Sequence, residues 1–209
     1  MRQLVIMAKV PRAGRVKTRL AAGLGTVEAL RFYRNALAAT VRRLVQPGRW
    51  QTRLSIAPDT ASQIDFPFVS NSGLKLQVQP QGPGDLGARL QRVFQMAPPG
   101  AVLVIGSDIP AITPTLISDA FAVLEGQQAV FGPSDDGGFW LIGLQAGRRF
   151  PPHLFKGVRW STSHARADSV QALGVSRVGM VASLDDVDDI GSFNRLHALS
   201  TRVILPVSS

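Results

Sequence analysis

Short apolar segments alternate with longer amphipathic segments along the chain. The apolar segments are rich in β-branched residues and predict strands, whereas the amphipathic segments repeat apolar positions every three or four residues and predict helices. Strands are expected at residues 3–8, 51–57, 75–79, 101–105, 129–131, 139–144 and 175–181. Helices are expected at residues 26–45, 85–96, 114–126 and 161–173, with a further helix after residue 189. This alternation predicts an α/β fold.

One strand should lie at the centre of the sheet. The run Ala101–Ile105 is apolar at every position, which is typical of a strand covered by helices on both faces. Gly106 ends the run, and Ser107 and Asp108 follow at its carboxyl end. In open α/β sheets, ligands bind just outside the carboxyl ends of the strands. Asp108 is therefore placed either to hold a hard cation with the phosphates that it carries or to cap the next helix.

Length and composition favour a globular protein. The chain has 209 residues, of which 45% are hydrophobic and 18% charged, and we expect one domain over residues 1–209 with a terminal tail from about Thr201. There is no cysteine, which excludes disulfides and thiolate metal sites and is compatible with the expected cytoplasmic location. The apolar run Leu4–Ala8 is too short for a signal-peptide core or a membrane span, so no membrane span is expected.

The charge balance indicates anionic partners. The net charge is +9, and the basic residues are mostly arginine. They are spread along the chain without aromatic interleaving, which disfavours a nucleic-acid interface. Five of them nevertheless follow the first predicted strand within eleven residues: Lys9, Arg12, Arg15, Lys17 and Arg19. A basic loop at a strand end, followed by a helix N-terminus, can bind phosphate, although a solvated loop has the same composition. The spacing of a Walker A loop is absent.

Three further segments carry candidate chemistry. In the turn GPSDDGG, Asp135 or Asp136 can bind metal, accept a hydrogen bond from a substrate, or shape the turn. Trp160 can stack on a substrate or pack as a hydrophobic staple before the next helix. Four carboxylates precede the terminal helix and suit its N-terminal charge or a second ligand for the cation at Asp108: Asp185, Asp186, Asp188 and Asp189.

Six motifs together resemble a known family. They are MAKVPRAGRVKTRL at the start, GDLGARL near 85, IGSDIP at 105, GPSDDGGFWLIGL at 132, VRWSTSH at 158 and DVDD at 186. In this order they are similar to a family of small bacterial proteins in the GT-A glycosyltransferase superfamily, some of whose members are assigned to arsenosugar biosynthesis. A weaker similarity extends to molybdenum-cofactor and 2-phospholactate guanylyltransferases. The resemblance covers nearly the whole chain and implies a doubly wound, mostly parallel Rossmann-like sheet, with the Phe139 strand antiparallel to its neighbours.

The resemblance also implies roles for particular residues. Lys9, Arg12, Lys17 and Arg19 would bind the phosphates of a nucleotide. Asp108 would be a metal ligand, matching the last aspartate of the glycosyltransferase DxD motif, and Asp188 or its neighbour Asp186 would complete the site for Mg²⁺ or Mn²⁺. The substrate or acceptor pocket would include Asp136, Gly137, Gly138 and Trp160. No catalytic base is identified.

The leading hypothesis is therefore a metal-dependent transferase. It would move a glycosyl group from a nucleotide-diphospho-sugar to a small-molecule acceptor, and the cation and basic loop would stabilise charge on the leaving diphosphate. The alternative is nucleotidyl transfer from a nucleoside triphosphate with release of pyrophosphate, which the five cations of the first loop favour. A third hypothesis is a non-catalytic nucleotide-binding protein, because the DxD motif is reduced here to Gly-Ser-Asp.

Overall fold

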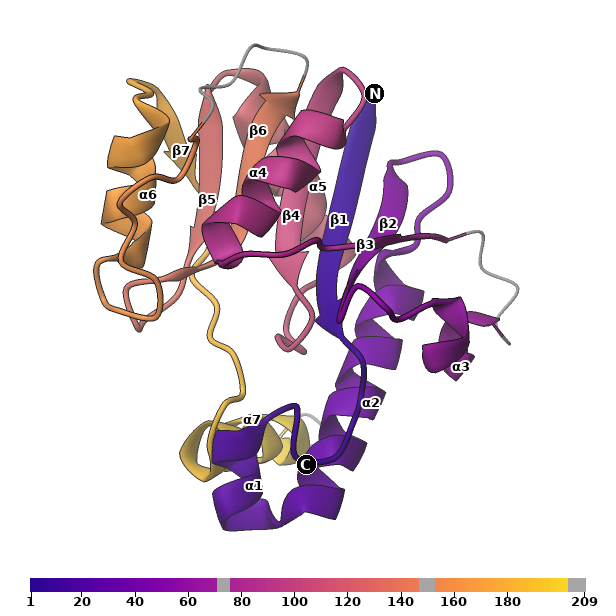
Figure 1. Ribbon diagram of the computed structural model, residues 1–209. Coiled ribbons are helices and arrows are strands. Elements are labelled where there is room, and N and C mark those ends of the chain that lie inside the picture. The colour runs from indigo at the N-terminus through magenta and orange to yellow at the C-terminus, as the bar shows by residue number, and fades with distance from the viewer. Residues whose placement is uncertain (71–75, 147–152, 203–209) are drawn as a thin grey trace, which may run out of the picture.

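The computed structural model describes residues 1–70, 76–146 and 153–202. In this part of the chain, one seven-stranded sheet has the order β3-β2-β1-β4-β6-β5-β7 (Figure 1). Its strands are β1 (Arg2–Lys9), β2 (Gln51–Ala57), β3 (Gln77–Pro80), β4 (Gly100–Gly106), β5 (Ala129–Pro133), β6 (Phe139–Ala146) and β7 (Val178–Met180). Only β6 runs against its neighbours β4 and β5, and the other pairs are parallel. The predicted mostly parallel α/β sheet with an antiparallel Phe139 strand is thus confirmed.

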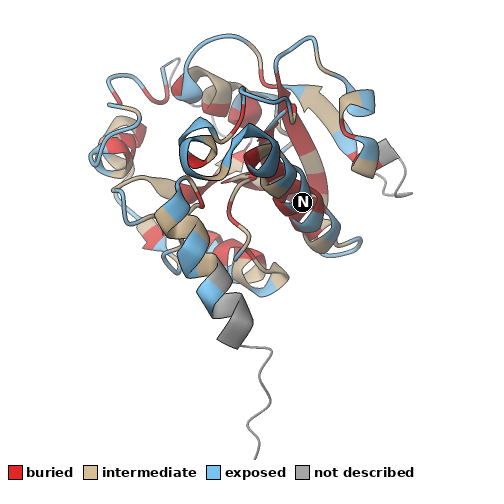
Figure 2. Ribbon diagram, turned by 90° about the horizontal axis from the view of Figure 1, so that it is seen from below, coloured by how far each residue is buried: buried red, intermediate tan, exposed pale blue. Residues whose placement is uncertain are grey.

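Helices cover both faces of the sheet. They are α1 (Thr18–Leu24), α2 (Thr26–Leu44), α3 (Pro67–Ser70), α4 (Leu86–Met96), α5 (Pro114–Glu125), α6 (Ala165–Leu173) and α7 (Ile190–Arg202), with a 3₁₀ turn at Gln63–Asp65. Apolar side chains of α2 and α5 form one core with the sheet, while those of α4 and α6 form a second core on the other face. Buried residues accordingly concentrate in the strands and on the inward sides of these helices (Figure 2). No helix in the described ranges has the length and apolar character needed to cross a bilayer.

The central strand, β4, is apolar at every position from Ala101 to Ile105 because helices cover both of its faces. Leu103 and Ile105 pack into the core beneath α2 and α5, whereas Val102 and Val104 pack into the core beneath α4. Successive side chains of a strand point to opposite faces, so a strand covered on both faces needs an apolar residue at each position. The strand ends at Gly106, and this places Asp108 at the carboxyl edge of the sheet.

Two local details differ from the sequence-based expectation. The last two residues of the basic loop, Thr18 and Arg19, are helical, because α1 begins at Thr18. Helix α6 begins only at Ala165, because the hydroxyl of Thr162 donates to the Arg159 carbonyl and accepts from the His164 N–H, and so closes a turn instead of capping the helix.

The carboxyl edge of the sheet carries a small helical cluster. Helices α1 and α7 pack against each other beside the lower end of α2, below the ends of β1 and β4 (Figure 1). At this contact a Cβ atom on Gly23 of α1 would lie 3.0 Å from the Cβ of Ile190, so the two helices approach closely. The segment that links β7 to α7 returns along this edge and brings the acidic residues 185–189 toward Asp108.

Candidate active site

Three carboxylates meet at the carboxyl edge of the sheet. Asp108 follows β4, while Asp186 and Asp188 lie on the segment before α7. Each offers one oxygen, and these oxygens all lie within 4.8 Å of one another. The structure therefore brings together the carboxylates that the sequence analysis left as alternatives, since both Asp186 and Asp188 lie near Asp108.

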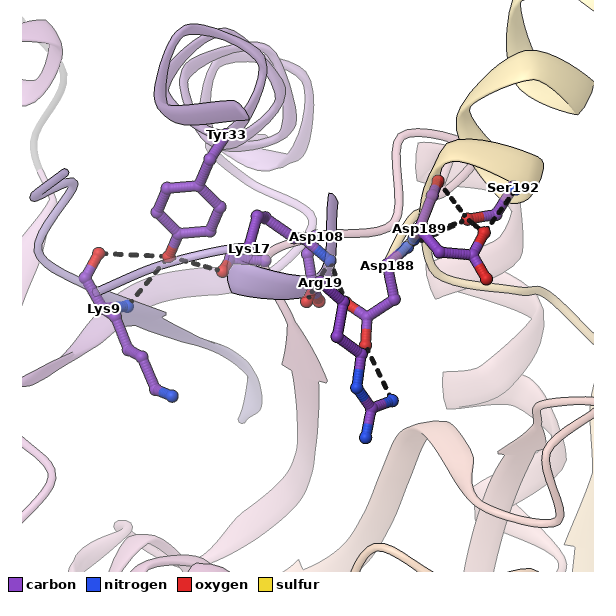
Figure 3. Close-up of polar contacts among 9 residues, drawn as sticks. Lys9, Lys17, Arg19, Tyr33, Asp108, Asp188, Asp189 and Ser192 are labelled. Atoms are coloured by element: carbon purple, nitrogen blue, oxygen red, sulfur yellow. Dashed lines mark hydrogen bonds and ion pairs between the residues drawn. The ribbon is translucent and has the colours of Figure 1, made fainter. Parts of the chain in front are cut away.

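A lysine ammonium lies between two of these carboxylates. Lys17 Nζ donates to Asp108 Oδ2 at 2.9 Å and to Asp188 Oδ1 at 2.6 Å (Figure 3). The Lys17 side chain is 3% exposed, and its backbone is left-handed with φ 49°. Burial by itself lowers the pKa of Lys17, but the charges and hydrogen bonds of Asp108 and Asp188 outweigh it and raise the pKa above the usual value. Lys17 is therefore the protonated counter-ion of the acidic cluster.

Among the residues that the structure describes, no lysine or arginine forms an ion pair with the third carboxylate, Asp186. Burial raises the pKa of Asp186 to about 6, and the nearby charge of Asp188 adds to the rise. Arg19 lies farther out, with Nη1 3.9 Å from Asp188 Oδ2 and a side chain 80% exposed. Three carboxylates thus share one buried ammonium, which leaves an excess of negative charge in the cluster.

Tyr33 joins the ends of the two central strands. Its hydroxyl donates to the Lys9 carbonyl at 3.0 Å, accepts from the Lys9 N–H at 2.9 Å, and lies 3.2 Å from Ser107 Oγ (Figure 3). Burial raises the pKa of Tyr33, so its hydroxyl stays protonated. Tyr33 lies on the buried face of α2, and its hydroxyl also fixes the start of the basic loop against Ser107, the residue before Asp108.

A cavity of about 580 Å³ opens over the ends of β1 and β4. Its wall includes three carboxylates, Asp85, Asp108 and Asp188, and five cationic side chains, Lys9, Arg15, Lys17, Arg19 and Arg89. We call it the first cavity. Its position agrees with the general rule that ligands bind at the carboxyl edge of an open α/β sheet.

Gln81 and Arg89 are part of this wall and were not singled out from the sequence. The buried Gln81 amide donates to the carbonyls of Ala8 and Ser55, at 3.1 Å and 2.9 Å. Its oxygen accepts from Arg89 Nη1 at 3.0 Å, and Arg89 Nε donates to the Gly84 carbonyl at 3.0 Å. The guanidinium of Arg89 is thus held in place before any ligand arrives. No local sequence pattern marks the long-range hydrogen bonds from Gln81 to Ala8 and Ser55.

A smaller cavity of about 200 Å³ lies on the other side of Asp108, and we call it the second cavity. Asp136, Gly138 and Trp160 line it, together with Asp186. Gly137 is absent from its lining, because the residue faces the backbone of α6's leading turn: a Cβ there would lie 2.1 Å from the Ser163 carbonyl oxygen. The four residues of the expected acceptor pocket are therefore neighbours, and three of them face one cavity.

The phosphate-binding candidates divide between two places. Lys9, Lys17 and Arg19 line the first cavity. Arg12 does not; it lines an adjoining cavity with Lys9 and lies 3.5 Å from Asp65 in an ion pair.

Sequence comparison places the chain in a family. The model of the uncharacterized proteins conserved in bacteria known as DUF2064 matches residues 40–162. The chain belongs to the DUF2064 family. None of the curated proteins matches its sequence.

Solved structures show the same fold as this DUF2064 protein. A protein from Desulfovibrio desulfuricans G20, provisionally described as a nucleotide-diphospho-sugar transferase, is 26% identical with a TM-score of 0.83, covering 100% of this chain and 91% of that one. A nucleotidyl transfer enzyme from Methanothermobacter thermautotrophicus is 20% identical with a TM-score of 0.61 (97% and 99% covered). Rv0371c from Mycobacterium tuberculosis H37Rv, solved with manganese, is 17% identical with a TM-score of 0.50 (93% and 97% covered). The DUF2064 chain thus has the fold of nucleotide-diphospho-sugar transferases, as the motifs implied.

Proposed function

We propose that this DUF2064 protein is a divalent-cation-dependent transferase that binds a nucleotide-diphospho-sugar in the first cavity and passes the glycosyl group to a small acceptor. The observation that carries the proposal is the Lys17 ammonium, buried between Asp108 and Asp188 in a cavity whose wall is otherwise rich in cations. Carboxylates that attract a cation, beside cations that attract phosphates, are complementary to a metal–nucleotide complex. The similarity to the Desulfovibrio desulfuricans protein supports the same class of donor.

The acidic cluster fits Mg²⁺ or Mn²⁺. Asp108, Asp186 and Asp188 supply three carboxylate oxygens within 4.8 Å of one another, and hard divalent cations bind oxygen ligands. When bound, such a cation stabilises negative charge on the leaving diphosphate. The manganese in the structure of Rv0371c supports this assignment.

The chain's own residues have separate tasks in this proposal. Lys9, Arg15 and Arg19 bind the phosphates and neutralise them as charge develops on the leaving group. Tyr33 hydrogen-bonds to Lys9 at the start of the basic loop and lies next to Ser107, so it fixes the position of the loop relative to Ser107 and Asp108. A phosphate in the cavity also gives the Lys17 ammonium an alternative partner to the two carboxylates.

Nucleotidyl transfer is the second candidate, and one observation favours it. Besides Lys17, which is paired with Asp108 and Asp188, the first cavity has four cationic side chains in its wall, which is more positive charge than a diphosphate diester requires. A nucleoside triphosphate would use this charge more fully, and the product would then be pyrophosphate. Product analysis separates the two reactions, because glycosyl transfer releases a nucleoside diphosphate and nucleotidyl transfer releases pyrophosphate.

The first test is nucleotide binding with and without Mn²⁺. Mono-, di- and triphosphates of the four ribonucleosides are titrated into the wild type, Asp108→Asn and a control, Asp119→Asn, which removes an equal charge from exposed α5. A ligand at a hundred times its dissociation constant adds about 2.7 kcal/mol of stability, which raises the melting point by roughly 2–4 °C per kcal/mol. We expect Mn²⁺-dependent binding in the wild type and in the control, and its loss in Asp108→Asn. Nucleotide affinity that is the same with and without Mn²⁺, and the same in Asp108→Asn as in the wild type, would contradict the proposal.

A further inference from the structure

The two cavities differ in charge. The first cavity has five cations and three carboxylates, Asp85, Asp108 and Asp188, in its wall. The second shares Leu86, Gly106 and Asp108 with it, so the two adjoin, yet its charged lining consists of Asp108, Asp136 and Asp186. Within the described ranges, no lysine, arginine or histidine lines the second cavity. The boundary between the two kinds of wall therefore falls at Asp108, where the proposed chemistry takes place.

Asp136 gives the second cavity a negative charge that is independent of the cation site. Its Oδ1 accepts from the Ser134 hydroxyl at 2.6 Å and from the Gly138 N–H at 2.9 Å. Both bonds use the same oxygen, so Oδ2 keeps its capacity to accept a hydrogen bond from a ligand. A cation held by Asp108 and Asp186 would neutralise those two carboxylates but would leave Asp136 charged.

The basic residue beside the cavity is already engaged. Arg159 precedes Trp160 and donates two side-chain hydrogen bonds to Asp168, at 2.8 Å and 2.9 Å. Its backbone N–H donates to the same carboxylate at 3.0 Å. A bidentate arginine–carboxylate pair has a fixed geometry, so the guanidinium is directed to Asp168 and not to the second cavity.

The remaining lining is aromatic and hydroxylated. Phe139 and Trp160 meet edge to face with ring centroids 6.3 Å apart, and both line the cavity. Ser134, Ser161 and Thr162 contribute hydroxyl groups. The volume of about 200 Å³ is below the range of roughly 300–1,000 Å³ for drug-sized ligands, so the cavity suits one small unit. An aromatic wall opposite hydrogen-bond acceptors is complementary to a ring or chain that bears hydroxyl groups.

We propose that the second cavity takes the acceptor, and that the acceptor is an uncharged or cationic hydroxylated compound rather than a phosphate ester or a carboxylate. This inference rests on the proposed function, because it assigns the second substrate of the same reaction. An anionic group beside Asp136 would find no lysine, arginine or histidine among the residues that line the cavity, and the charge of a cation at Asp108 and Asp186 would already be balanced by those carboxylates. A hydroxyl or ammonium group can instead donate to the free oxygen of Asp136. An anionic analogue should bind at least about tenfold more weakly than its neutral or cationic counterpart.

Charged quenchers of tryptophan fluorescence test the potential in the cavity directly. Trp50 and Trp140 are buried at 6% and 2% exposure, so Trp160 is the accessible tryptophan, and Trp160→Phe identifies its share of the signal. I⁻ is intrinsically the more efficient quencher, so the quenching constant for each ion is divided by that for free N-acetyltryptophanamide. After this normalisation we expect Cs⁺ to quench Trp160 more than I⁻, although the net charge of +9 favours I⁻ elsewhere on the surface. Asp136→Asn should reduce this preference, and the control Asp119→Asn should not. Equal normalised quenching by both ions, or stronger normalised quenching by I⁻, would overturn the proposal.

A set of ligands with one skeleton tests the chemical class. D-glucose, D-glucosamine and glucose 6-phosphate are compared, in the presence of Mn²⁺ and nucleotide, for their ability to protect Trp160 from the neutral quencher acrylamide. Protection by the neutral or cationic member, at concentrations at least about tenfold below the phosphate ester, is expected. Protection by the phosphate ester alone, or by none of the three, would overturn the proposal. Nucleotide titration of the same samples reports the first cavity, so a failure of the proposed function is seen separately.

Discussion

Replacing Lys17 by methionine should make the protein bind Mn²⁺ more tightly when no nucleotide is present. The substitution keeps an apolar stem of similar length but removes the ammonium that Asp108 and Asp188 now share. If those carboxylates form the cation site, the ammonium occupies a position that competes with the metal. This direction is opposite to the usual result of mutating a residue in a binding site.

The expected size follows from the two ion-paired hydrogen bonds. Each hydrogen bond to a charged group contributes about 1.5–3 kcal/mol. Asp108 and Asp188 are 33% and 43% exposed, so solvent screens the pair and the total gain should be about 1.5–3 kcal/mol rather than twice that. This corresponds to an increase of roughly tenfold to a hundredfold in Mn²⁺ affinity.

Calorimetric titration with MnCl₂ measures the effect, and circular dichroism confirms that the variant is folded. The matched control is Arg19→Met, which removes a charge 3.9 Å from Asp188 on a side chain that is 80% exposed. Because exposed ion pairs contribute about 1 kcal/mol or less, the control should change Mn²⁺ affinity by less than about fivefold. In the presence of nucleotide the sign should reverse, since Lys17→Met also removes the phosphate contact proposed for this ammonium. A Lys17→Met protein that binds Mn²⁺ no better than the wild type would refute the assignment of the cation to these carboxylates.

Three further predictions concern stability. Tyr33→Phe removes a buried hydroxyl with three polar neighbours and should lower the free energy of unfolding by about 1–3 kcal/mol in urea denaturation. Gly137→Ala combines a φ of 81° with a Cβ 2.1 Å from the Ser163 carbonyl oxygen and should cost at least about 1–3 kcal/mol, measured in the same way. The hydrogen bonds from Arg159 lower the pKa of Asp168 to about 2 from 3.8. Because the folded-state pKa is the lower one, this carboxylate stabilises the protein above pH 4, and the contribution should disappear as the pH falls toward 2. Melting curves of the wild type and Asp168→Asn should therefore converge in acid, and a difference that persists at pH 2 would contradict the assignment.

The sheet could be predicted well because its signals are local. The strand at Gln51–Ala57 has the bounds expected from the sequence, and the apolar run of β4 identified the central strand. That strand in turn placed Asp108 at the carboxyl edge, since a strand end fixes the position of the next two residues. Helix starts were less predictable. Thr162 has a hydroxyl that suits an N-cap, but the same hydroxyl closes a turn with the carbonyl of Arg159.

The sequence could predict which residues belong to the candidate site, but not which of their side chains contact one another. Lys17, Asp108 and Asp188 were all identified, yet Lys17 was expected to contact phosphate and not the two carboxylates. The pairs that join them are 91 and 171 residues apart, so no sequence spacing reports them. The same is true of the hydrogen bonds from Gln81 to the carbonyls of Ala8 and Ser55, which are 73 and 26 residues away. Side-chain partners across the sheet edge follow from the packed fold and have no local signature.

Because α1 and α7 pack closely together, the residues of the acidic cluster are attached to different parts of the fold. Lys17 immediately precedes α1, and Asp188 lies two residues before α7 begins at Ile190, so both are attached to the same pair of packed helices. Asp108 is attached to the sheet. The segment before α7 is also tied to Asp108, because the Val187 N–H donates to the Asp108 carbonyl at 3.5 Å. A change at the close approach of Gly23 to Ile190, outside the cavity, would therefore alter the position of Lys17 and Asp188 relative to Asp108.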